Sequence, residues 1–164
     1  MEIRKVKWDG QKMTITWDSG DGERTSISHT LTSDERPSPE FVEAMRDVVA
    51  PAARLLELGE GSRERMTFRS ATASLDDQGR RGMTVCVLRE IAGASAPVVE
   101  NTPYLPEADA EDPNPCLPTD LEGAVDDVMA FAVRFVRGGE REQADMFEAE
   151  LAEELEDRGL VATR

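Results

Sequence analysis

Histidine, cysteine, lysine and aromatic residues are all scarce in this sequence. Among 164 residues there are one histidine, two cysteines and three lysines, and aromatic residues make up 5%. A single histidine excludes a histidine-rich metal site and an acid/base pair of two histidines. Apolar runs long enough to span a membrane are also missing, and the first residues, "MEIRKVKWDG", contain no apolar signal region. We therefore expect a cytoplasmic protein.

The two cysteines stand where neither a disulfide nor a zinc site is expected. Cys86 lies in the apolar run "MTVCVLREI" and is predicted to be a small buried hydrophobic residue. Cys116 lies in "DPNPCLPTD" without a second cysteine or a histidine nearby. A chain of this length buries a core without cross-links. We expect neither a bound metal nor a cofactor.

Acidic residues are abundant and unevenly placed. The formal net charge is −15, and residues 101–164 hold 17 acidic and 5 basic residues, against 17 and 14 in the first hundred. All three lysines, Lys5, Lys7 and Lys12, lie near the start, and no basic stripe follows. Such a surface repels phosphate backbones, although a local basic patch is compatible with it. We therefore expect no direct binding of nucleic acid.

Alternating apolar residues and turn signals predict an α+β fold built mostly of antiparallel sheet. Asp9 and Gly10 form the turn between two such segments, as in a β-hairpin. The predicted order is βββα-βββα, with two packed amphipathic helices. The predicted strands cover about residues 3–8, 13–17, 23–31, 65–75, 82–91 and 96–105. The halves share this order without enough identity to indicate a sequence repeat.

Capping residues and glycines set the predicted ends of the two helices. The first is expected to begin at Ser38 and end at Gly59, with Pro51 kinking or dividing it. The second is expected over about residues 120–136, where Thr119 and Glu122 form a capping box. The double glycine that follows predicts a domain of residues 1–139 and an acidic tail of residues 140–164.

No residue arrangement typical of an active site occurs in the chain. The glycine-rich segments lack phosphate-binding spacing, and no G-x-S-x-G segment is present. His29 shares one side of a predicted strand with apolar residues, so we expect it to be partly buried with one hydrogen-bond partner. Asp126 and Asp127 are neighbours on a helix and point in different directions, which makes them a poor acid/base pair. We expect a protein that is not an enzyme.

The pentapeptide "QADMF", residues 143–147, has the pattern Q-x-x-[L/M]-F. It resembles the clamp-binding motif by which bacterial polymerases and repair proteins dock on the DNA sliding clamp. The resemblance implies that Gln143 hydrogen-bonds at the edge of a clamp pocket, while Met146 and Phe147 fill its apolar floor. Methionine stands where leucine is commoner, an exchange that conserves volume. The likeness covers five residues.

The same segment also has the periodicity of a helix. Phe147, Leu151 and Leu155 are spaced at four-residue intervals, so residues 144–159 also predict a short amphipathic helix whose apolar edge packs on the domain. In that alternative Phe147 is a core residue and not a docking residue. The sequence leaves both alternatives open.

In general appearance the whole chain resembles small uncharacterised proteins encoded in the replication regions of tailed bacteriophages of high-GC hosts. The features shared are a β-rich front, the segment "NTPYLPE" and the Q-x-x-[L/M]-F tail. The resemblance implies an accessory protein that engages a sliding clamp, either to recruit replication to phage DNA or to compete with host partners of the clamp.

Two other functions fit the sequence. The acidic C-terminal half could imitate DNA and inhibit a host nucleic-acid-binding or defence protein. Alternatively, the paired β-rich halves, each with a helix, resemble a clamp-like processivity fold. That fold would need basic helices facing DNA, and acidic residues match or outnumber the arginines in both predicted helices.

Overall fold

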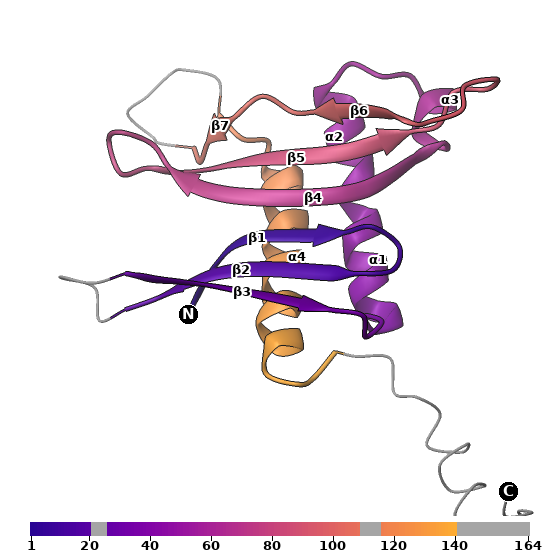
Figure 1. The fold of residues 1–164 in the computed structure, drawn as a ribbon. Coiled ribbons are helices and arrows are strands. Elements are labelled where there is room, and N and C mark those ends of the chain that lie inside the picture. The colour runs from indigo at the N-terminus through magenta and orange to yellow at the C-terminus, as the bar shows by residue number, and fades with distance from the viewer. Residues whose placement is uncertain (21–25, 109–115, 141–164) are drawn as a thin grey trace, which may run out of the picture.

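One antiparallel sheet carries the helices on one of its faces (Figure 1). The structure, a computed structural model, describes residues 1–20, 26–108 and 116–140. The predicted α+β class with mostly antiparallel sheet is confirmed. The elements are β1 (Glu2–Trp8), β2 (Met13–Ser19), β3 (Ile27–Ser33), α1 (Pro39–Asp47), α2 (Val49–Leu55), α3 (Glu60–Arg63), β4 (Met66–Leu75), β5 (Arg81–Arg89), β6 (Val98–Asn101), β7 (Leu105–Pro106) and α4 (Thr119–Val136).

The strands lie in the order β3-β2-β1-β4-β5-β6, and β7 also pairs with β5. β1 and β4, the first strands of the two halves, lie side by side at the centre. Their register is Lys5↔Thr72, Val6↔Ala71 and Lys7↔Ser70. Each half is therefore a meander that runs from the centre of the sheet to one edge and is followed by helix.

A hydrophobic core fills the space between the sheet and the helices. Helix α4 runs across the strands, with α1 beside it (Figure 1). The ring of Phe41 in α1 stacks on that of Phe131 in α4, with 5.6 Å between the ring centroids. Phe41 and Phe135 are fully buried, and burying a side chain of this size contributes roughly 1.5–3 kcal/mol. In the part of the chain that the structure describes, no helix has the length and apolar character needed to cross a membrane.

Helix α1 begins as predicted. The Oγ atom of Ser38 accepts a hydrogen bond from the backbone N–H of Phe41 at 3.2 Å, and Pro39 occupies the first turn. The predicted division of this helix is also confirmed, and the break falls at Val48 between α1 and α2. Pro51 explains it, because proline has no N–H to donate and its ring crowds the carbonyl four residues earlier.

Gly59 does not end a helix, so this part of the prediction is wrong. The backbone N–H of Leu58 donates to the carbonyl of Ala53 at 2.9 Å. Glu57 adopts a positive φ of 56° in the same turn. This closed turn ends α2 before Gly59 is reached. Gly59 is instead the N-cap of α3.

The predicted capping box of α4 is also wrong. Pro118 occupies the N-cap position and no side chain caps the helix there. Thr119 is already the first helical residue, so its hydroxyl lies past the position from which a cap accepts. At the other end, Gly138 has a φ of 90° and its N–H donates to the Phe135 carbonyl at 3.0 Å. The double-glycine stop is therefore confirmed.

The last predicted strand is divided into β6 and β7. Pro103 lies between them and cannot donate to a sheet ladder, which explains the interruption. Tyr104 follows, and its ring lies against Gly82 of β5. A side-chain Cβ at position 82 would come within 2.3 Å of Tyr104 Cζ. The glycine therefore makes room for the ring.

The sheet face opposite the helices, here called the open face, is covered by none of the helices that the structure describes (Figure 1). Directly paired residues on neighbouring strands lie on the same face of a sheet. The register therefore identifies the residues that form the surface of the open face. Hydroxyl side chains dominate it: Thr14, Thr16, Thr30, Thr32, Ser70, Thr72 and Thr84. Cys86 lies there too and is only half-buried. Its predicted burial in the core is wrong, because Val85 and Val87 on either side take the core positions.

Candidate functional site

The last described residue, Glu140, is held to two helices. Its carbonyl accepts from the N–H of Ser38 at 2.7 Å, and its Oε2 accepts from the Ser38 hydroxyl at 2.7 Å. Its Oε1 accepts from Arg134 Nε at 2.7 Å. The point from which the tail leaves the domain is thereby fixed beside α1 and α4. The boundary at residue 139 stays a prediction, with Glu140 attached to the domain by these contacts.

The predicted docking residues Gln143, Met146 and Phe147 lie outside the described residues. Gln143 follows Glu140 by three positions. The structure therefore describes the chain up to three residues before the docking segment and places none of its residues.

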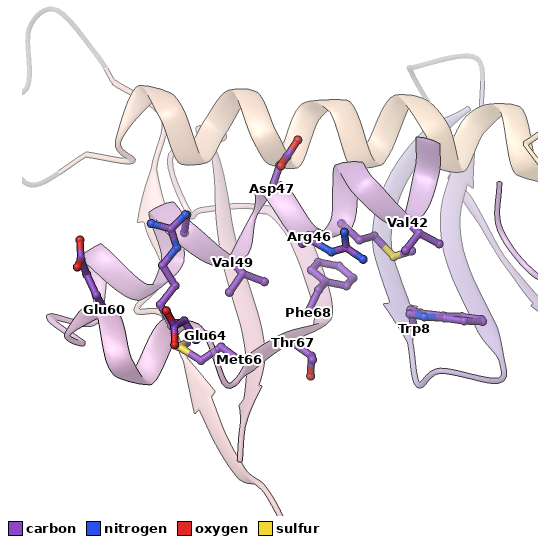
Figure 2. Close-up of a pocket in the computed structure, with 13 residues that line it drawn as sticks. Trp8, Val42, Arg46, Asp47, Val49, Glu60, Glu64, Met66, Thr67 and Phe68 are labelled. Atoms are coloured by element: carbon purple, nitrogen blue, oxygen red, sulfur yellow. The ribbon is translucent and has the colours of Figure 1, made fainter. Parts of the chain in front are cut away.

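An apolar groove lies between the first helices and the start of β4 (Figure 2). Its volume is about 710 Å³. Figure 2 shows the Phe68 ring between Val49 on one side and Trp8 on the other. Met45 and Met66 also line the groove. All of these except Trp8 are at least 93% buried, so the groove is a shallow opening onto the core.

Charges of both signs surround this apolar floor: Arg46, Asp47, Glu60, Arg63 and Glu64. The described residues that line the groove include neither histidine nor cysteine, and Thr67 supplies their one hydroxyl. An apolar floor with a charged rim is suited to holding an apolar side chain or ligand. The sequence did not predict this groove, because its lining comes from β1, the helices and β4, which are far apart in the sequence.

A second, acidic groove of about 220 Å³ runs between α1 and α4. Its carboxylates are Glu40, Glu43, Asp47 and Asp127. Asp126 points elsewhere, since its Oδ1 accepts from Arg81 Nη2 at 2.8 Å. The prediction that Asp126 and its neighbour diverge is confirmed.

His29 has the surroundings that the sequence predicted. It is partly buried, and its Nε2 lies 2.6 Å from Ser19 Oγ. Its ring stacks on Trp17 at a centroid distance of 5.3 Å. Ring stacking and one hydrogen bond fix the imidazole at the edge strand β3.

Three aspartates have lowered pKa values, each through contacts within a turn or a strand pair. Backbone N–H donors, first of Lys12, lower the pKa of Asp9. A hydrogen bond from Arg4 lowers the pKa of Asp18. The backbone N–H of Arg80 is the largest influence lowering the pKa of Asp76. These carboxylates stabilise local structure as anions.

The arginines after that turn are engaged within the chain. Arg80 Nε lies 2.9 Å from Asp76 Oδ2. Arg81 pairs with Glu107 and Asp126. Both arginines therefore form ion pairs within the chain.

Comparison with family models, curated proteins and solved structures gave no match to this chain. The likeness of residues 143–147 to clamp-binding peptides therefore stays a prediction, as does the likeness of the chain to phage proteins.

Proposed function

We propose that the protein is a non-enzymatic accessory protein that binds a protein partner through its C-terminal tail. The partner is a DNA sliding clamp, and the setting is the cytoplasm, that of the host if the chain is phage-encoded. Gln143 fixes the register of the docked segment. Met146 and Phe147 anchor it in an apolar pocket, because a few buried apolar side chains supply most of the affinity of a short peptide.

The fixed position of Glu140 is the observation that carries this proposal. Its bonds to Ser38 and Arg134 hold the tail's starting point on the surface of the domain. Gln143 follows this fixed point by three positions, so a partner that binds the peptide would be held close to the domain. In this proposal the domain anchors the tail, and a few residues separate the domain from the docking peptide.

A decoy that imitates DNA is the second candidate function, and the charge of the helices favours it. The helices hold eight acidic residues against four arginines: Asp47, Asp120, Asp126, Asp127, Glu40, Glu43, Glu60 and Glu122. Several of these acids meet in the groove between α1 and α4. A surface of this kind attracts proteins that bind nucleic acid.

The same count disfavours a clamp-like processivity fold. In such a fold the helices face DNA, and an excess of carboxylates on that layer would repel phosphates. We therefore place this candidate third.

Direct binding to a purified bacterial sliding clamp tests the proposal. Met146→Ala with Phe147→Ala should weaken binding by about a hundredfold or more, because both anchors are lost. Gln143→Ala should cost about tenfold, since it deletes one hydrogen bond. Leu151→Ala with Leu155→Ala is the matched control, and it should leave clamp affinity unchanged.

Melting temperatures of the same variants separate docking from packing. Docking requires that the variant with Met146→Ala and Phe147→Ala melts within a few degrees of the parent. A large drop in melting temperature without any partner would instead make Phe147 a core residue. A stable parent chain with no affinity for the clamp would also refute the proposal, and steep loss of binding to a nucleic-acid-binding protein with added salt would favour the decoy.

A further inference from the structure

Three cations gather in a hollow on the open face. Lys5 and Lys7 of β1 and Arg69 of β4 line it, together with residues of β5 and β6, and its volume is about 360 Å³. The two lysines are two positions apart on one strand, so their side chains leave the same face. We call this site the basic hollow. The sequence shows that the two lysines are close together in the chain. It did not predict Arg69 beside them, because Arg69 is brought there by the pairing of β1 with β4.

The three cations of the basic hollow have no acidic partner among the described residues, which is also true of Arg46, Arg63, Arg65 and Arg137. Arg4, Arg54, Arg80, Arg81, Arg89 and Arg134 are all ion-paired with carboxylates. Lys5, Lys7 and Arg69 form no ion pair with any described residue, although acidic residues outnumber basic ones by 34 to 19 in the chain. The pKa of Asp9 is lowered chiefly by the backbone N–H groups of Lys12 and Gln11, which donate to its Oδ1 at 2.7 and 3.0 Å, while Arg69 and Lys7 contribute less.

Hydroxyl groups, not carboxylates, stand beside the cations. Lys5 pairs across the sheet with Thr16 and Thr72, and Lys7 pairs with Thr14 and Ser70. Opposite charges are the usual way to stabilise a charged cross-strand pair, and clustered like charges repel. Hydroxyl groups can orient an anion by hydrogen bonds but cannot neutralise a lysine. No described residue therefore neutralises these three charges, and an anion bound in the hollow would do so.

We propose that the basic hollow binds a small molecule through a phosphate monoester. Two ammonium groups and a guanidinium match a dianion, and the guanidinium binds phosphate oxygens in pairs. The volume is within the range of small-molecule pockets. Leu88 and Val99 at the β5 and β6 end would contact the apolar part of the ligand.

A nucleic acid fits this hollow less well. The described lining residues include no aromatic side chain on which a base could stack. The net charge of −15 also repels a long polyanion more strongly than a small one. This inference concerns a face of the sheet that the proposed clamp interaction does not use.

Cys86 provides a local probe, since it lines the basic hollow, whereas Cys116 is exposed elsewhere. The full chain is alkylated with iodoacetamide in the presence of glycerol 3-phosphate or of glycerol. Glycerol 3-phosphate should slow alkylation of Cys86 by roughly tenfold at roughly ten times its Kd, because only the ligand-free fraction reacts. The rate at Cys116 should not change. Glycerol should protect neither cysteine.

Variants that remove the cations test their role. Lys5→Gln with Lys7→Gln and Arg69→Gln should abolish the protection of Cys86 and the rise in melting temperature that the ligand causes. The matched control removes the same charge at three exposed positions outside the hollow, with Lys12→Gln, Arg65→Gln and Arg137→Gln. It should retain both effects.

Four results would overturn the inference. The first is equal protection by glycerol and glycerol 3-phosphate. The second is protection that survives removal of the three hollow cations or is lost in the control variant. The third is no protection by glycerol 3-phosphate, inorganic phosphate or pyrophosphate. The fourth is protection by single-stranded DNA or by an acidic peptide under conditions where the three phosphate compounds have no effect, since the hollow would then serve a macromolecule.

Discussion

Gly82 has no side chain, and the ring of Tyr104 occupies the space that a side chain would fill. The Tyr104 ring lies on its backbone, and the Tyr104 hydroxyl is 3.4 Å from the carbonyls of Ser74 and Arg80. The ring thereby covers the end of β5 where β7 joins the sheet. A glycine in a strand normally weakens it, and an aromatic ring over the glycine offsets that loss.

Gly82→Ala should destabilise the protein by about 1–3 kcal/mol, because the new methyl group overlaps the Tyr104 ring. Thermal unfolding measures the loss. Gly61→Ala is the control, since nothing lies within 4 Å of a Cβ at that position, and it should not lower the melting temperature. If Gly82→Ala is equally costly in a Tyr104→Ala background, the overlap is not the cause.

Helix α1 depends on a cap that serves two parts of the chain. Ser38 is 7% exposed, accepts from Phe41 N and donates to Glu140. One hydroxyl therefore closes the first turn of α1 and attaches the segment after α4. Helix α4, in contrast, begins at Pro118 without a side-chain cap.

Ser38→Ala should lower stability by about 1 kcal/mol or more, since both hydrogen bonds are lost. Thr119→Ala should have little effect, because the structure gives that hydroxyl no capping role. Urea unfolding of the two variants distinguishes them. A larger loss for Thr119→Ala would mean that the capping box predicted from the sequence forms in solution.

Local sequence patterns predicted the strands and helices better than the grooves that lie between them. Alternation placed β1, β2, β4 and β5, and Ser38 and Pro51 located the start and the division of the first helix. Missed were α3, which is too short to show a period, and the division of the last predicted strand into β6 and β7. The apolar groove and the basic hollow were also missed, because both are lined by elements that are far apart in the sequence. The docking peptide was predicted from five residues alone and stays untested.

Charge is distributed by layer across the whole molecule. The helices have an excess of acidic residues, whereas the strands hold six basic and three acidic residues: Arg4, Lys5, Lys7, Arg69, Arg81 and Arg89 against Glu2, Asp18 and Glu100. The helices are therefore the more acidic layer of the domain. A net charge calculated for the chain hides this asymmetry.

Acid should destabilise the whole molecule below about pH 4. Asp9, Asp18 and Asp76 have folded-state pKa values below the ordinary value of 3.8. Folding therefore favours the ionised forms of these aspartates. Their contribution to the free energy of unfolding is present above pH 3.8 and is lost as the pH falls through the folded-state pKa values.

Unfolding free energy measured against pH tests this expectation. Asp76→Asn should make the loss on acidification shallower, because asparagine has no proton to gain. The same change at the exposed neighbour Asp77 serves as the control, and it should leave the slope as in the parent. An unaltered slope in the Asp76 variant would assign the acid sensitivity to other groups.

The pairing of β1 with β4 also bears on the chain during its synthesis, because β1 has a free edge until β4 is made. β2 follows β1 at once, but β4 begins only at Met66, so the growing chain has an unpaired β1 edge until then. Unpaired edges recruit strands from other chains, and lysine side chains on an edge discourage this. We therefore expect Lys5 and Lys7 to discourage pairing with other chains until β4 is added, after which they line the basic hollow.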